Sequence, residues 1–198
     1  FLTRKMDLIY DVSTTIYTGM IIGYNIEGGS GIAVVNSQTN INNLMLIITT
    51  DNTIHEVALR LFARCMMYGN PNKDNNYISA EHFRQLDQAV PPAVKALINH
   101  KSETATYNNL RAYEKPSQDN YIFGILNYHP YFGINNITSR LKVLQLNNSD
   151  IIDIGYSAND PGIAYNTLDI LNEVFARQYQ DLRYGETNNV IKFFEREV

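Results

Sequence analysis

The chain has 198 residues, of which 44% are hydrophobic, so it is long enough to bury a core of its own as a single domain. Only 18% of the residues are charged and the formal net charge is -4, which provides no basic surface for a phosphate backbone and argues against nucleic acid as a partner. The single cysteine, Cys65, excludes an intramolecular disulfide framework, and no segment approaches the ~20 consecutive apolar residues that a membrane helix needs.

The N-terminal part of the chain predicts a strand, a loop and a short helix. Residues 8–17 are rich in β-branched and aromatic residues that alternate imperfectly with polar ones, which is typical of a strand. Residues 19–31 are glycine-rich and suit an exposed, mobile loop. Apolar residues then recur at the spacing of one helix face, at Ile41, Leu44, Met45 and Ile48.

The middle of the chain predicts a series of helices. The best-formed one starts at a capping box made by Thr53 and Glu56, and its apolar stripe includes Cys65, which we therefore expect to be buried. Ser79 is a suitable cap for the next helix, and the proline pair at 91–92 interrupts that helix. We expect further short helices near residues 93–100, 103–114 and 120–127.

After residue 130 the pattern predicts a hairpin and a long helix. Two strand-like segments, 141–146 and 150–156, flank an Asn-Asn-Ser sequence of turn composition. The last helix has a start signal in which Asp160 caps the free amides and Pro161 takes the first helical position. If this helix continued through Val198 it would be about 57 Å long, with Gly185 as its weakest point.

Together these elements predict an α+β (mixed α/β) fold in which residues 1–198 form one domain. A small sheet is formed by the N-terminal strand and the late hairpin, the middle is helical, and the long C-terminal helix outreaches the domain.

No motif in the chain predicts catalysis. The sequence Gly28-Gly29-Ser30-Gly31 does not fit the Gly-x-Ser-x-Gly pattern of a nucleophile elbow, because the residue two positions after Ser30 is Ile32 and not glycine. No Gly-Lys-Ser or Gly-Lys-Thr is present to hold a nucleotide phosphate. The 4 histidines are never three or four residues apart, which disfavours a metal site. We therefore expect no catalytic residue, no cofactor and no metal.

One aromatic cluster is open to two interpretations. Its members, which lie close together in the sequence, are Tyr121, Phe123, Tyr128, Tyr131 and Phe132. Aromatic faces can stack against sugar rings, but they also build ordinary cores, and we favour the core. Under the other interpretation Tyr128 and Tyr131 are the candidate glycan contacts.

The start of the last helix and the strand before it resemble a known family. The motif is Ser157, Asp160 and Pro161, followed by Ala164, and it comes directly after a hydrophobic strand and directly before a long helix. Residues 10–17 are similar to the strand that follows the first membrane helix in the same family. On these features the chain resembles the polysaccharide co-polymerases, the Wzz-type chain-length determinants. One departure is Asp169, where many relatives carry Asn.

The resemblance implies the extracytoplasmic domain of a chain-length determinant, truncated at both ends so that the flanking membrane helices are absent. The parent would be a bacterial inner-membrane protein with a periplasmic domain. It would form a homo-oligomer and regulate chain length in lipopolysaccharide, capsular or exopolysaccharide biosynthesis, in contact with the polysaccharide polymerase and the growing glycan. The family implies a non-catalytic scaffold here, and a tyrosine kinase domain, where relatives have one, would lie outside this chain.

Two further expectations concern surfaces. Ile170 and Val174 lie off the main apolar stripe of the last helix, so we expect them to face another subunit. The alternative function is a glycan-binding or adaptor module of a polysaccharide export complex, which would use the aromatic cluster near Tyr128.

Overall fold

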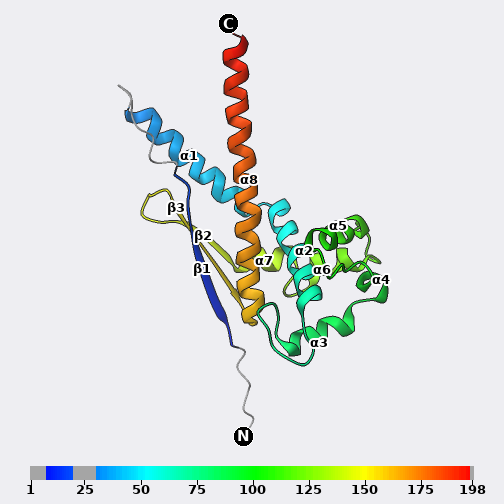
Figure 1. The fold of residues 1–198 in the computed structure, drawn as a ribbon. Coiled ribbons are helices and arrows are strands. Elements are labelled where there is room, and N and C mark those ends of the chain that lie inside the picture. Colours follow the sequence, from blue (N-terminus) through cyan, green and yellow to red (C-terminus); the bar gives the residue numbers. More distant parts are fainter. Residues whose placement is uncertain (1–7, 20–29, 197–198) are drawn as a thin grey trace.

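A three-stranded antiparallel sheet and a long helix organise the molecule (Figure 1). The computed structural model describes residues 8–19 and 30–196, so the loop predicted at 19–31 lies almost wholly outside the described residues. Within them the chain forms eight helices and one sheet, which confirms the predicted α+β fold. The sheet has the order β1-β3-β2, with strands β1 (Tyr10–Tyr17), β2 (Leu141–Gln145) and β3 (Ile151–Ala158).

The central strand β3 pairs along its whole length with β1. The register runs from Tyr10 opposite Ala158 to Tyr17 opposite Ile151, so the predicted N-terminal strand joins the predicted hairpin. The hairpin turn places Asn147 and Asn148 at φ 49° and 53°, left-handed values that asparagine tolerates better than most residues. The side chains of β3 alternate between a buried and a half-buried face, as expected for a sheet covered on one side.

Helices α1 (Ser30–Ile48) and α2 (Asp51–Tyr68) precede the polar loop at residue 70. The cap of α2 is Thr50, whose hydroxyl accepts from the Thr53 amide at 3.4 Å, so the predicted capping box at Thr53 and Glu56 is wrong. The Thr53 hydroxyl instead donates to the Ile47 carbonyl at 2.8 Å, within the tight connection between the two helices. Cys65 is fully buried, as predicted, and burial raises the pKa of its thiol.

Shorter helices form the rest of the middle, and most begin at caps visible in the sequence. The side chains of Ser79, Ser102 and Asn120 each accept from an amide three residues on. Helix α7 was not predicted. The helices are α3 (Ala80–Ala89), α4 (Pro92–Lys95), α5 (Glu103–Tyr113), α6 (Tyr121–Tyr128) and α7 (Ile134–Arg140).

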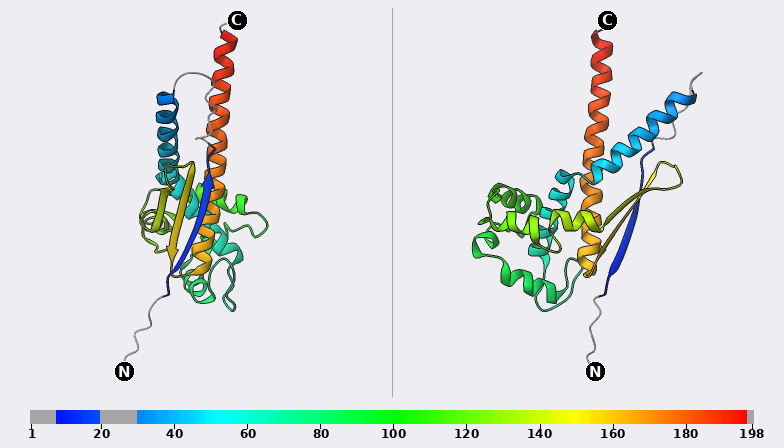
Figure 2. Two further views of the ribbon diagram at one scale, coloured as in Figure 1. Left: turned by 90° about the vertical axis from the view of Figure 1, so that its left-hand side faces the viewer. Right: turned by 180° about the vertical axis from the view of Figure 1, so that it is seen from behind.

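Helix α8 (Pro161–Arg196) has 36 residues and runs unbroken through Gly185. At about 1.5 Å per residue it is about 54 Å long. Its first half lies between the sheet and α2, and its second half extends beyond the body of the domain (Figures 1 and 2). The helices lie on one side of the sheet, and the other face has no covering helix among the described residues (Figure 2).

The position of α8 corrects one expectation about its surface. Ile170 and Val174, which we expected to face another subunit, are both 0% exposed. Because α8 packs against α2 on one side and against β1 and β3 on the other, it buries a wider surface than a single stripe. The predicted oligomer surface at these residues is therefore wrong.

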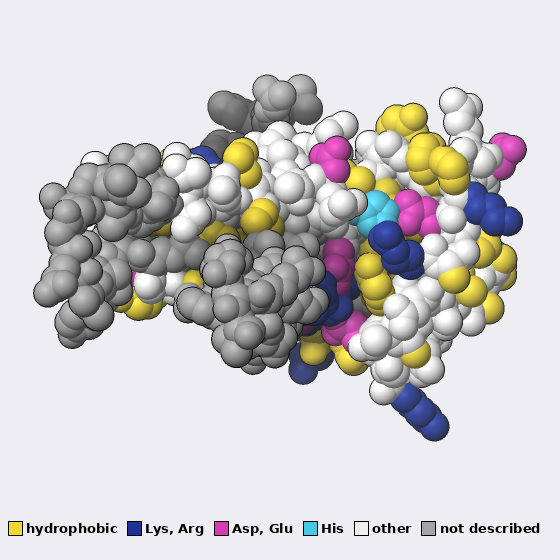
Figure 3. Space-filling model, turned by 90° about the horizontal axis from the view of Figure 1, so that it is seen from above, with side chains coloured by type: hydrophobic (Ala, Val, Ile, Leu, Met, Phe, Trp, Pro, Cys, Tyr) yellow, Lys and Arg dark blue, Asp and Glu magenta, His cyan; other side chains and the backbone are white. Residues whose placement is uncertain are grey.

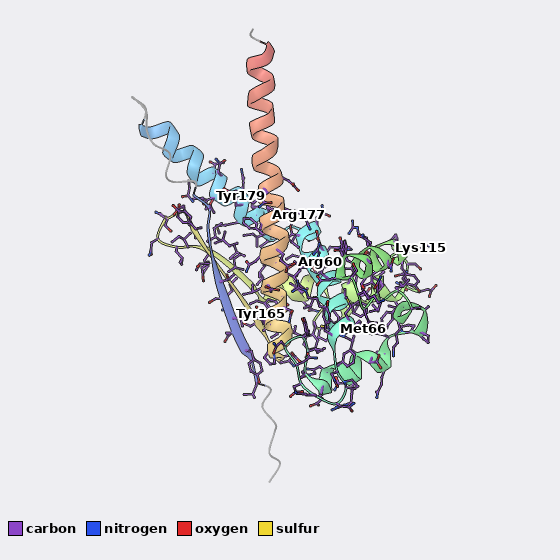
Figure 4. All side chains as sticks on the ribbon, in the orientation of Figure 1. Arg60, Met66, Lys115, Tyr165, Arg177 and Tyr179 are labelled. Carbon is purple, nitrogen blue, oxygen red and sulfur yellow. The ribbon has the colours of Figure 1, made fainter. Side chains whose placement is uncertain are left out.

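Polar contacts hold α8 on both sides. Figure 4 shows Arg177 and Tyr179 on opposite sides of the helix. The guanidinium of Arg177 donates to Glu56 of α2 at 2.6 Å, and the Tyr179 hydroxyl donates to the Thr18 carbonyl at 2.8 Å, just after β1. These contacts fix the helix between the two layers that its apolar residues bury.

A second ionic group is centred on Arg64 of α2. Its guanidinium contacts Asp169 at 2.5 Å, Glu173 at 2.7 Å and Glu103 of α5 at 2.9 Å. Burial opposes its charge, but these carboxylates outweigh burial and raise the pKa of Arg64. Asp169, the departure from the family pattern, is therefore an ion-pair partner between α8 and α2. Seen from above, charged side chains of both signs are interspersed with uncharged ones (Figure 3).

Candidate functional site

Asp160 joins the start of α8 to the start of α3. Its side chain is 0% exposed and accepts from the Ile163 amide at 3.1 Å, which confirms the predicted helix cap. The other carboxylate oxygen accepts from the Ser79 amide at 2.9 Å and lies 2.7 Å from Nδ1 of His82, which is 78 residues earlier in the chain. One buried carboxylate therefore organises the first turns of two helices.

The ionised carboxylate of Asp160 determines which ring nitrogen of His82 donates to it. Burial alone would raise the pKa of Asp160, but the hydrogen bonds from His82, Ser79 and Ile163 outweigh burial and lower it. An ionised carboxylate only accepts hydrogen bonds, so Nδ1 of His82 carries a proton. The second ring nitrogen, Nε2, is left for other partners.

The remaining motif residues have structural positions. Pro161 opens α8, Ala164 is buried and its amide donates to the Asp160 carbonyl at 2.9 Å. The hydroxyl of Ser157 donates to Asp11 on β1, so it ties the two strands that carry the resemblance. Gly162 follows Pro161, and a Cβ at Gly162 would lie 2.5 Å from the backbone of the 77–78 segment. This helix start therefore packs directly on backbone.

A cavity of about 330 Å³ lies beside the Asp160–His82 contact. Four parts of the chain converge on it: α3, the segment between α6 and α7, the last residue of α7, and the residue before Asp160. The side chains that give it chemical character are His82, Gln85, His129, Tyr131, Arg140 and Asn159.

Aromatic rings form one wall of the cavity. The Tyr131 ring meets the His82 ring edge to face at 5.3 Å, and His129 stacks on Phe132 at 4.5 Å. Nδ1 of His129 accepts from the Tyr131 amide at 3.1 Å, and burial lowers the pKa of His129 to about 4. His129 is therefore neutral at pH 7, with its proton on Nε2.

Arg140 is the cationic group of the cavity. It is half-buried, and none of the carboxylates in the described ranges forms an ion pair with it. Its nearest effect is on Tyr156: burial raises the pKa of that hydroxyl, and the Arg140 charge partly opposes the rise. The guanidinium therefore has a positive charge at the cavity wall without a counter-charge among the described residues.

No known protein family, curated protein or solved structure matches the chain. None of the described helices is both long and apolar enough to cross a bilayer.

The predicted aromatic cluster is divided by the structure. Tyr131 is 8% exposed and lines the cavity, and Phe132 is fully buried in the core, as the favoured interpretation had it. Tyr128 is 74% exposed at the end of α6 and does not line the cavity. The two candidate glycan contacts, Tyr128 and Tyr131, thus face different surroundings.

Most residues of the cavity were missed by sequence reasoning. His82 and His129 were considered only as metal ligands, and among the residues with described positions no group of His, Cys, Asp or Glu could hold a metal ion. Gln85 and Arg140 carry no local signal at all. Asn159, next to Asp160, lay within a segment that the sequence had marked, and Tyr131 and Phe132 belonged to the predicted aromatic cluster.

Proposed function

We propose that this chain is the periplasmic domain of a bacterial inner-membrane protein that regulates polysaccharide chain length, and that it acts as a non-catalytic oligomeric scaffold. The observation that carries the proposal is that the segments with the resemblance form one continuous structural unit. Strands β1 and β3, which carry the two separated parts of the family resemblance, pair in register, and β3 leads through the buried cap Asp160 into the 36-residue helix α8.

This unit supports the proposal because the resemblance was found in separate segments of sequence. A generic helix-start motif would not require a distant strand to pair with the strand before it. Here Ser157 of the motif contacts Asp11 of the N-terminal strand, so both parts belong to one structural element.

The scaffold role is supported by the shape of α8. Its first half is held between two layers, and its second half continues away from the sheet (Figure 1). A helix that projects in this way offers a surface to a neighbouring subunit. Ile170 and Val174 are buried within the domain, so they take no part in such a contact.

The test is the length distribution of surface polysaccharide, resolved by gel. We would compare cells that lack the parent gene with cells in which it is restored. Polymer that persists but loses its preferred length in the absence of the gene is the expected result. An unchanged distribution would contradict the proposal.

A glycan-binding or adaptor role in an export complex is the second candidate, and the cavity favours it. Aromatic rings beside amide and guanidinium groups are the combination that small polar ligands need, because the rings cover an apolar face and the polar groups fix orientation. Such a role predicts direct binding of glycan to the purified chain, which a purely structural scaffold does not.

A further inference from the structure

The cavity beside Asp160 has a volume that limits its ligand. At about 330 Å³ it is at the small end of ligand pockets, which are usually about 300–1,000 Å³. It is therefore suited to one unit of a polymer or to a small molecule, and a whole folded partner does not fit.

The charge of the cavity selects an anion. Asp160 lies behind His82 and its oxygens are engaged by Ile163, Ser79 and His82, so it offsets any positive charge on the imidazole. Arg140 has no such partner among the described carboxylates, so its charge is the one left uncompensated at the cavity wall. A guanidinium fork matches a planar carboxylate with two parallel hydrogen bonds, which an ammonium group cannot do.

The remaining wall suits a polyhydroxylated ring. Tyr131 offers an aromatic surface, and His129 is kept neutral, so its imidazole adds a flat face and one N–H donor without added charge. Gln85 and Asn159 each supply an amide that can donate and accept, as alternating sugar hydroxyls require.

We propose that this cavity binds one acidic sugar unit, a hexuronate, with its carboxylate on Arg140 and its ring beside Tyr131. The inference rests on the proposed function for the choice of a sugar as the carrier of the carboxylate. It goes further in naming an acidic polysaccharide as the polymer that the domain contacts.

The test is titration of the purified chain with D-glucuronate, followed by NMR, with D-glucose and acetate as comparison ligands at equal ionic strength. The expected order is glucuronate tighter than either comparison ligand, because glucose lacks the charge and acetate lacks the ring. Equal binding of glucose or of acetate would overturn the proposal, and so would an absence of glucuronate binding.

The decisive variant is Gln85→Glu, which adds a carboxylate at an exposed position of the cavity wall. Its matched control is Gln88→Glu, an exposed residue of the same helix that does not line the cavity. We expect Gln85→Glu to weaken glucuronate binding roughly tenfold and Gln88→Glu to leave it unchanged. Equal effects of the two variants would overturn the proposal.

Arg140→Gln provides the second variant, with its thermal midpoint measured to confirm that it folds. Loss of the preference for glucuronate over glucose is expected, and a retained preference would refute the role of Arg140. Chain-length control in cells together with no glucuronate binding would remove this inference alone. Glucuronate binding without chain-length control would support the inference and leave the glycan-binding role as the function.

Discussion

The substitution Asp160→Ala tests whether one carboxylate organises both helix starts. Loss of an N-cap alone costs about 1 kcal/mol. Asp160 also accepts from the Ser79 amide and from His82, and a lost hydrogen bond to a charged group costs about 1.5–3 kcal/mol, partly offset because a buried carboxylate is removed. We therefore expect a total loss of about 3 kcal/mol, which lowers the melting midpoint by about 6–12 °C for a chain of this size.

Thermal and urea unfolding followed by circular dichroism would measure this loss. The matched control is Ser102→Ala, because Ser102 caps α5 through the Ala105 amide at 3.1 Å and has no second helix to organise. That variant should lose about 1 kcal/mol. A loss in Asp160→Ala no larger than in Ser102→Ala would refute the reasoning.

The same variant has a defined pH dependence. The pKa of Asp160 is lower in the folded than in the unfolded state, so its carboxylate stabilises the fold above the unfolded pKa of about 3.9. This contribution is lost as the pH falls through the folded pKa. The difference in stability between the wild type and Asp160→Ala should therefore narrow below about pH 4, and a constant difference would show that ionisation has no part in it.

Three further predictions follow from individual contacts. Gly162→Ala places a Cβ 2.5 Å from backbone and should cost about 1–3 kcal/mol in urea unfolding, whereas Gly124→Ala, with nothing within 4 Å, should be neutral or stabilising; equal losses would contradict this. Arg64→Met leaves Asp169 without its ion-pair partner and leaves Glu103 and Glu173 with only the more distant Arg60, at 4.0 and 3.9 Å. It should cost about 2–3 kcal/mol, against less than about 1 kcal/mol for Arg177→Met at the surface, and the reverse order would be evidence against the Arg64 group. The pKa of His129 falls from 6.5 to about 4 on folding, so between these values the unfolded state binds a proton that the folded state does not, and the wild type should lose stability as the pH falls from 6.5 to 4. Melting scans at pH 7 and pH 5 should show a smaller loss of stability for His129→Gln than for the wild type, and equal losses would disprove this role.

The sequence by itself determined the elements and several of their ends. Alternation in the N-terminal strand, the turn composition of the hairpin and the caps at Ser79 and Asp160 are local signals, because each depends on residues within one turn or one strand. They were sufficient for the fold class and for the burial of Cys65. The cap of α2 is Thr50 and not Thr53, because the Thr53 hydroxyl bonds a carbonyl of the previous helix while the Thr50 hydroxyl accepts from an amide of α2. Both roles suit a threonine hydroxyl, so the sequence did not distinguish them.

Only the tertiary structure decided which side chains meet. One stripe on α8 could be read from its spacing, but that spacing could not show that a second layer covers Ile170 and Val174 from the other side. In the same way nothing local relates His82 or Arg140 to Asp160, since they come from helices that are brought together only when the apolar faces of α3, α7 and α8 are buried in one core. Periodicity records which face of an element is buried, whereas a site made from several elements depends on the partner that each face finds.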